Sequence, residues 1–296
     1  MPGSRNPSRN LRRWVVAGSI ANLTLAAVKL TAGLIGQSAA LVADAIESIT
    51  DLVGSLVVWS GLLYSARPPD DDHPYGHGKA EALATLIVAI LLFSAGIWIG
   101  LDAIHSLRTP HPVPAPFTLI VLLAVIATKE TFFQLLRRAA GRAGSTVLAA
   151  EALHHRADAI TSLAALVGIS VALIGGPAYA AADAWAALLA SLLVLYNAFN
   201  LLRKPFAELL DANASEILAP ARAVAAAVPG VVRVEKLRAR RSGAHFFLDM
   251  HLHVDPELSV AKGHAISGHV RAALRTQLPR IADVLIHIEP GPPATT

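Results

Sequence analysis

Long stretches without a charged residue restrict the fold of this chain more than any other feature. Residues 82–101, 159–182 and 184–202 contain no Asp, Glu, Lys or Arg. Each is close to the roughly 20 residues that an α-helix needs to cross about 30 Å of hydrocarbon. Three further stretches are mainly apolar but carry or adjoin charges, namely residues 14–36, 39–66 and 112–128. The chain is therefore predicted to be a membrane α-helical protein with six transmembrane helices.

The composition favours the same class. The 296 residues are 54% hydrophobic and 16% charged, with a mean hydropathy of +0.52, whereas about one quarter of a soluble domain is charged. This disfavours the alternative of a large soluble protein with buried helices. The chain has no cysteine, so a disulfide framework is excluded and any metal site must use nitrogen and oxygen ligands.

The basic residues of the short connections predict the orientation. Eleven of them fall on one side of the predicted bilayer and a single one falls on the other, which makes both termini cytoplasmic. The eleven are Arg5, Arg9, Arg12, Arg13, Arg67, Lys79, Arg137, Arg138, Arg142, Arg203 and Lys204, and the single one is Arg108. The predicted organisation is a cytoplasmic N-terminal tail (1–13), a six-helix transmembrane domain (14–204), a cytoplasmic domain (205–290) and a disordered tail (291–296). The basic residues form no continuous patch, so no nucleic-acid partner is expected.

The segment after Pro205 has the pattern of a small α+β domain. Helices are predicted over residues 215–228, with Ser215 as the cap, and 259–277. Strands are predicted over 231–240, 245–254 and 284–289 because apolar and polar residues alternate there, with a hairpin turn at Ser242–Gly243. The order αββαβ predicts helices on one sheet face, and the other face then presents His251, His253, His287 and Glu289.

Three carboxylates interrupt the second predicted span, at Asp44, Glu47 and Asp51. A charge near the bilayer centre costs at least about 2.5–3.5 kcal/mol, so such groups need a partner or water. Glu47 and Asp51 are four residues apart and share a helix face, and the fifth span offers a matching pair in His154 and Asp158. Together the two pairs offer three carboxylates and one imidazole, which suit a divalent first-row cation. The alternative is a set of structural salt bridges, in which Lys29, Lys129 or Arg156 neutralises these acids.

The connection between the second and third spans reads RPPDDDHPYGHGKAE. Asp70, His73 and His77 have ligand-like spacing, and the glycines beside them let the backbone turn the side chains inward. These three residues can hold a second cation. The alternative is an acidic, solvated loop.

These segments resemble one known family. LVADAIESITDLVGS, RPPDDDHPYGHGKAE and ALHHRADAITS are similar to the signatures of the cation diffusion facilitator transporters, and the tail SGAHFFLDMHLHVDP…LIHIEP resembles their cytoplasmic domain. The resemblance covers residues 12–290. It implies a homodimer of six-helix protomers in a lipid bilayer, each with a metallochaperone-like (ferredoxin-like) tail. It also implies divalent cation efflux from the cytoplasm by antiport with protons, across a bacterial inner membrane, and not an enzyme.

The resemblance also implies roles for particular residues. The transport site falls on Glu47, Asp51, His154 and Asp158, although the family usually has His or Asp where Glu47 stands. Asp44 belongs to the motif without being a usual ligand. The remaining implied positions are the loop site Asp70, His73 and His77, the tail site His251, His264, His287 and Glu289, and an inter-subunit salt bridge between Lys79 and Asp211. Glu235 replaces a further family histidine, so an altered binuclear centre is expected in the tail, and Asp249 and His253 receive no role.

The ligand types allow several cations, and the predicted class allows several functions. Zinc is the first expectation because of its high affinity for nitrogen and oxygen sites, followed by Fe²⁺, with Co²⁺, Mn²⁺ and Cd²⁺ open. The alternatives are an intramembrane metallohydrolase, a passive divalent channel and a membrane metal sensor that does not transport. The hydrolase is disfavoured because neither HExxH nor GxSxG occurs in the chain.

Overall fold

We describe the chain from a computed structural model. It describes residues 7–109, 112–143 and 146–291, without the side chains of residues 7–19, 140, 142–151, 154 and 157. The chain forms two compact units. One contains Met1–Val57 and Val88–Asn200, and the other contains Val58–Ile87 and Leu201–Thr296. Residues 1–6 of the expected N-terminal tail and 292–296 of the expected C-terminal tail lie outside the described residues, and residues 7–13 belong to the first helix.

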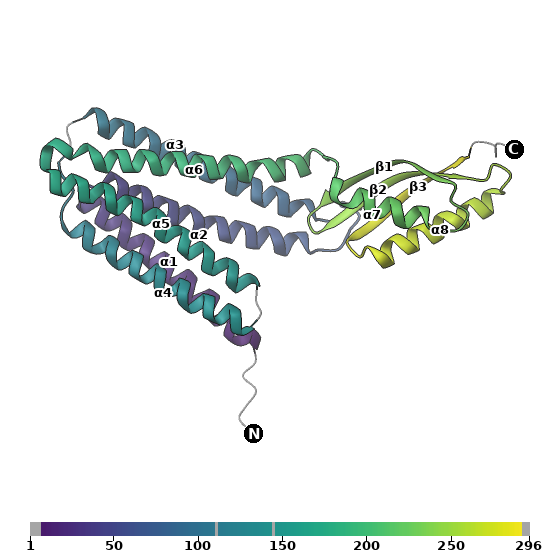
Figure 1. Cartoon of the computed structure of the whole chain (residues 1–296), viewed down its shortest axis with the longest axis horizontal. Coiled ribbons are helices and arrows are strands. Elements are labelled where there is room, and N and C mark those ends of the chain that lie inside the picture. The colour runs from purple at the N-terminus through teal and green to yellow at the C-terminus, as the bar shows by residue number, and fades with distance from the viewer. Residues whose placement is uncertain (1–6, 110–111, 144–145, 292–296) are drawn as a thin grey trace, which may run out of the picture. The chain divides into compact units, whose positions relative to one another are not determined.

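Six long helices account for residues 7–209 apart from their connections (Figure 1). Their bounds are α1 Pro7–Ile35, α2 Ala39–Ser65, α3 Lys79–Arg108, α4 Phe117–Ala143, α5 Thr146–Gly175 and α6 Ala181–Leu209. A helix bonds all its backbone groups internally, which is what a segment in hydrocarbon requires. Four helical segments of the described chain are long and apolar enough to cross a membrane, namely Lys79–Arg108, Phe117–Ala139, Asp158–Tyr179 and Ala181–Leu209, and Ile20–Ile35 is a shorter apolar helix.

Two helices end at other residues than the uncharged stretches do. The fifth helix stops at Gly175, within the uncharged stretch 159–182, and a short 3-10 helix, η1 (Gly176–Tyr179), follows it. Gly176 has a φ of +65°, a conformation that disfavours continuing an α-helix. The sixth helix extends beyond the uncharged stretch 184–202 and continues through Pro205 to Leu209. A proline removes one helical hydrogen bond without always ending the helix, and here it does not.

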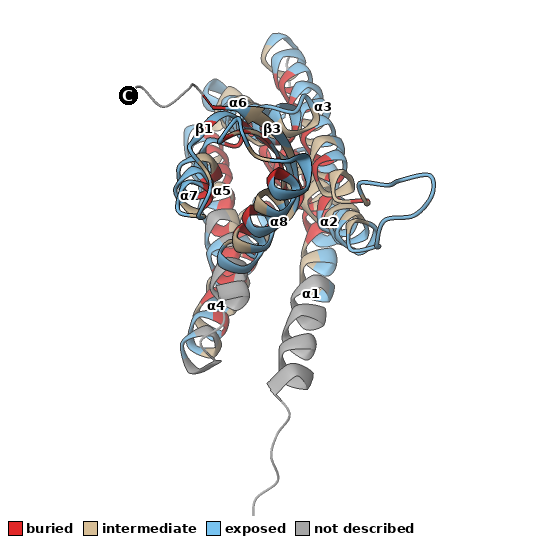
Figure 2. Cartoon of the chain, turned by 90° about the vertical axis from the view of Figure 1, so that its right-hand side faces the viewer, coloured by how far each residue is buried: buried red, intermediate tan, exposed pale blue. Residues whose placement is uncertain are grey.

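Small residues hold the first unit together. Its buried cluster is rich in alanine and joins α1 to α6, with Leu41, Leu122 and Ile169 as its larger members. At Gly168 an added Cβ would lie 2.4 Å from Cβ of Ala186, so α5 and α6 approach closely there. Exposed residues line the outer sides of these helices (Figure 2), as expected for helices that face lipid.

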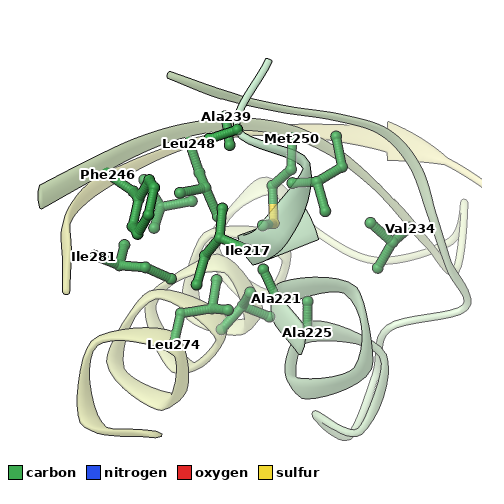
Figure 3. Packing of buried hydrophobic residues seen from close by; sticks show 14 of the residues in the cluster. Ile217, Ala221, Ala225, Val234, Ala239, Phe246, Leu248, Met250, Leu274 and Ile281 are labelled. Atoms are coloured by element: carbon green, nitrogen blue, oxygen red, sulfur yellow. The ribbon is translucent and has the colours of Figure 1, made fainter. Parts of the chain in front are cut away.

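The tail has the predicted αββαβ order. It consists of α7 (Ser215–Ala226), β1 (Arg233–Ser242), β2 (His245–Val254), α8 (Val260–Gln277) and β3 (Ile281–Pro290). The sheet order is β1-β2-β3, with β1 antiparallel and β3 parallel to β2. Figure 3 shows side chains of both helices and the sheet meeting in one core. The expected cap Ser215 is wrong, because the cap position is Ala214 without a side-chain bond, whereas Ser259 does cap α8.

The alternation in β2 is confirmed. Phe246, Leu248, Met250, Leu252 and Val254 are buried against the helices. The intervening residues lie on the opposite face, because side chains alternate along a strand. In the pairing of β2 with β3, His251 lies beside His287 and His253 lies beside Glu289. The sheet register therefore brings four ligand-type side chains together on the face away from the helices.

Candidate metal sites

The first α2 carboxylate, Asp44, is part of a buried ion-pair network. Lys29 of α1 lies 2.9 Å from Oδ1 of Asp44 and donates to the Asp44 carbonyl at 3.0 Å and to Oγ of Ser48 at 2.6 Å. Ser162 of α5 donates to both oxygens of Asp44, at 3.1 and 2.9 Å. All four residues are buried. Asp44 thus joins α1, α2 and α5, which fits the expectation that it is not itself a metal ligand.

The fifth-span carboxylate, Asp158, binds a lysine. Lys129 of α4 is 1% exposed and donates to Oδ2 of Asp158. Lys29 and Lys129 thus form two of the salt bridges named as the alternative, whereas Arg156 lies over the ring of Phe133 at 4.7 Å. The side chain of His154, expected to complete the transport site, lies outside the described residues.

The remaining expected transport ligands are on α2. Glu47 and Asp51 are partly buried, and the charges of Asp44, Asp51 and Asp158 all act on Glu47. Among the residues whose side chains are described, the compact groups of three possible ligands do not include Glu47, Asp51 and Asp158. These carboxylates share one electrostatic environment, and Asp158 bonds to Lys129.

The loop residues form a compact group. One ligand atom each from Asp70, His73 and His77 lies within 4.8 Å of the others. Oδ1 of Asp70 is 3.0 Å from Nδ1 of His73 and accepts from its backbone N–H at 2.7 Å, and Oδ2 is 3.3 Å from Nε2 of His77. Desolvation raises the pKa of Asp70, but the hydrogen bonds from His73 and the nearby imidazoles lower it by more. His77 is buried against the edge of Tyr64. This geometry suits a small cation with nitrogen and oxygen ligands.

A second compact group lies on the sheet of the tail. His251, His287 and Glu289 each place a ligand atom within 4.8 Å of the others. Oε1 of Glu289 is 2.6 Å from Nδ1 of His251 and 3.7 Å from Nε2 of His287. These three residues were expected at the tail site. The fourth, His264, is exposed on α8 beside Ser259 and Ile288, in a pocket of about 380 Å³, and it is not part of this group.

A third compact group contains Glu235, expected at an altered tail centre, and His253, to which the sequence assigned no role. Glu235, His253 and Glu289 also lie within 4.8 Å of one another. Nε2 of His253 is 2.9 Å from Oε2 of Glu235 and 3.3 Å from Oε2 of Glu289. The hydrogen bond with His253 lowers the pKa of Glu235. The alternation of β2 was an available signal, but the register shift in β1 between Val234 and Leu237 that accompanies Glu235 is not visible in the sequence.

Lys79 and Asp211 form a salt bridge within this chain. Nζ of Lys79 lies 2.7 Å from Oδ1 of Asp211. The resemblance implies a bridge between subunits, whereas here both residues belong to one chain. Asp211 has a φ of +53°, in the turn after α6, and Asp249 lines a polar pocket of about 390 Å³ with it.

Two family models together cover most of the chain. A model described as the cation efflux transmembrane domain matches residues 15–210. A model described as the cytoplasmic domain of cation efflux proteins matches residues 214–291.

Several characterised proteins are similar along most of this chain. The manganese efflux system protein MneP of Bacillus subtilis (strain 168) is 34% identical over 284 residues, covering 94% of this chain and 96% of that protein. Metal tolerance protein C1 of Arabidopsis thaliana is 33% identical over 294 residues, covering 93% of this chain and 61% of that protein. The cation-efflux pump FieF of Cronobacter sakazakii (strain ATCC BAA-894) is 29% identical over 284 residues, covering 95% and 93%.

Among solved structures, one titled MamM-CTD 215-293 is 36% identical to this chain, with a TM-score of 0.24, and covers 25% of this chain and 92% of that one. The transmembrane model matches the segment with the apolar helices, and the cytoplasmic-domain model matches the αββαβ tail. The first relative matches along nearly the whole chain. The chain belongs to the cation diffusion facilitator family of divalent metal transporters.

Proposed function

We propose that this protein exports a divalent first-row cation from the cytoplasm in exchange for protons. The cation is the substrate, and its site is formed by Glu47 and Asp51 of α2 with His154 and Asp158 of α5. The observation that carries this proposal is the group of acidic side chains on α2 and α5, Glu47, Asp51 and Asp158, whose charges act on one another in two otherwise mainly apolar helices. Acids at such positions are expensive unless they serve an ion pathway.

Protons can drive the cycle because they compete with the metal for the same atoms. Binding requires ionised carboxylates and a neutral imidazole at His154, so proton uptake expels the cation. If the site opens to the cytoplasm with few protons bound and to the outside with more, the pH gradient drives export. Members of this family are transporters, which disfavours the metallohydrolase alternative.

The donor set leads us to place Mn²⁺ beside Zn²⁺ as the cation carried. Three carboxylates and one imidazole form an oxygen-rich site, and carboxylates suit manganese. The relative named as a manganese efflux protein is 34% identical over nearly the whole chain. Zinc, the first expectation from the sequence, has the higher intrinsic affinity at most such sites, so selectivity for manganese must come from geometry.

Transport by reconstituted protein tests the proposal. Purified protein in proteoliposomes is given Mn²⁺, Zn²⁺, Fe²⁺, Co²⁺ or Cd²⁺ at a series of imposed pH gradients, and metal uptake and proton release are recorded together. We expect at least one cation to move with a stoichiometric counterflow of protons. Metal flux that ignores the pH gradient would instead identify a passive channel.

Variants then test the site. Asp158→Asn and Glu47→Gln should each abolish metal-dependent proton flux, while the matched control Glu216→Gln, in the first turn of α7, should retain it. Flux by folded Asp158→Asn at the level of the unmodified protein would contradict the assignment of the site.

We further propose that the tail dimerises and senses cytosolic metal. Support comes from the two compact ligand groups that share Glu289 and from the cytoplasmic-domain model that matches the tail. A cation bound between two tails would favour the closed dimer, because a ligand shifts an equilibrium toward the state it binds more tightly.

Titration of the tail with Mn²⁺ and Zn²⁺, with dimerisation followed by light scattering, tests the sensing role. Tail that binds no metal at micromolar concentrations would contradict the sensing role, and metal binding without flux by the full chain would identify a sensor that does not transport.

A further inference from the structure

Within this proposed transport site, we infer that Lys129 is an internal cation that competes with the metal for Asp158. Its ammonium group occupies the carboxylate until a dication displaces it, and its return helps to release the dication. Lys129 thereby sets the affinity of the site and the rate of release. This inference rests on the proposed function.

The contact of Lys129 carries the inference. Its side chain is 1% exposed, on α4, and it donates to Oδ2 of Asp158, whose side chain is 13% exposed. Asp158 is the one ion-pair partner that the described side chains give to Lys129. An unpaired buried ammonium is costly, so Lys129 must hold a carboxylate or find water when a metal takes Asp158. The oxygen proposed to ligate the cation is therefore already engaged by a tethered positive charge.

The second buried lysine is a natural comparison, because its contacts are those of a fixed group. Lys29 has three acceptors within 3.0 Å, on Asp44 and Ser48, which use all three hydrogens of an ammonium group. Its carboxylate partner, Asp44, is in turn held by Ser162. Lys29 is therefore built into the packing of α1, α2 and α5, whereas the ion pair that the described side chains give Lys129 is with a proposed ligand.

The charges of this region agree with such an exchange. The electrostatic environments of Glu47 and Lys29 include Asp44, Asp51, Asp158 and Lys129. When ionised, these four carboxylates and two ammonium groups leave two negative charges, which one dication balances. Because Lys129 remains near Asp158 after displacement, it repels the bound cation and weakens the site. A site that must release its substrate in every cycle needs such a limit on its affinity, because tighter binding is expressed mainly as slower dissociation.

Two substitutions at Lys129 predict opposite changes. Lys129→Gln removes the competing charge, so the KM for Mn²⁺ and kcat should both fall, each about tenfold. Lys129→Arg offers a planar fork that binds a carboxylate through two hydrogen bonds, so its KM should rise several-fold. The measurement is the initial rate of Mn²⁺ uptake by proteoliposomes over a range of Mn²⁺ concentrations, or of Zn²⁺ or Fe²⁺ if the unmodified protein carries that cation instead.

The matched control is Lys29→Arg, whose partner is not a proposed ligand, and its KM should not change. A purely structural role for Lys129 would reduce the amount of active protein, and thus the apparent kcat, without moving KM. An unchanged KM in both Lys129→Gln and Lys129→Arg overturns the inference. If Lys129→Gln does not fold, an unchanged or lowered KM in Lys129→Arg alone overturns it. If the unmodified protein carries no metal, or if Asp158→Asn transports normally, the proposed function itself fails, which is a distinguishable result.

Discussion

A hydrogen bond with His253 changes the pKa of the Glu235 carboxylate on the tail. The bond with His253 lowers the pKa of Glu235 below the ordinary value of 4.5. A group whose pKa is lowered by folding stabilises the fold above its unfolded pKa, and this stabilisation is lost as the pH falls through the folded value. We therefore expect Glu235→Gln to lower the Tm of the tail at about pH 6, by about 2 °C or less because the site is exposed. The difference should shrink as the pH falls below the ordinary value of 4.5 and through the lowered pKa of Glu235.

The tail has a hydrophobic core of its own, so it can be expressed alone and unfolded by heat under circular dichroism. The control is Glu257→Gln, an exposed carboxylate in the turn before α8. A Tm difference between Glu235→Gln and the unmodified tail that stays constant from pH 6 to pH 3 would show that this hydrogen bond does not act through the ionised carboxylate.

At the scale of the helices, α2 depends on a cap supplied by another helix. Asp183, at the start of α6, accepts from Oγ of Ser38 at 2.8 Å and from the backbone N–H groups of Ala39 and Ala40 at 2.6 and 3.4 Å. We expect Asp183→Ala to destabilise the solubilised protein by about 2–3 kcal/mol, because the cap is lost and buried N–H groups remain unpaired. Asp183→Asn keeps one acceptor oxygen and should lose less. Thermal unfolding in detergent measures both, and equal stability of all three proteins would exclude the cap.

Substitution of Gly168 in α5 tests the close approach of α5 to α6, and Gly141 in α4 is the control. An added Cβ at Gly168 would lie 2.4 Å from Cβ of Ala186, whereas one at Gly141 would meet nothing within 4 Å. Gly168→Ala should therefore lower the Tm of the solubilised protein. Gly141→Ala should raise it slightly, since alanine in a helix is favoured over glycine by roughly 1 kcal/mol. A Tm for Gly168→Ala at or above that of Gly141→Ala would show that the helices can separate at no cost.

The helices and strands also show how far the sequence alone leads. Alternation in residues 245–254 predicts β2 with its observed bounds, because a period of two is a local property of the chain. The ends of α5 and α6 were less predictable, since Gly176 and Pro205 each permit more than one outcome. The pairing of Asp158 with Lys129 was foreseen only as one of three possible salt bridges. Which lysine approaches which acid depends on how helices distant in sequence pack, and helix periodicity does not contain that information.

For the whole molecule, the absence of cysteine makes the predicted topology directly testable. With both termini cytoplasmic, Thr109→Cys, after α3, should react with an impermeant thiol reagent added outside intact cells. Thr276→Cys, near the end of α8, should react only after the cells are opened. Both positions are exposed and the parent chain has no background thiol. The reverse pattern of labelling would invert the proposed direction of transport.

The carboxylate of Glu289 has a consequence for the way the tail responds to its ligands. One of its oxygens faces His251 and His287, and the other faces His253 and, through it, Glu235. The two compact ligand groups of the tail therefore share the carboxylate of Glu289. A cation bound in one group would reorient a ligand of the other. Metal binding by one group should therefore depend on metal binding by the other, and the loss of Glu289 should weaken both groups at once.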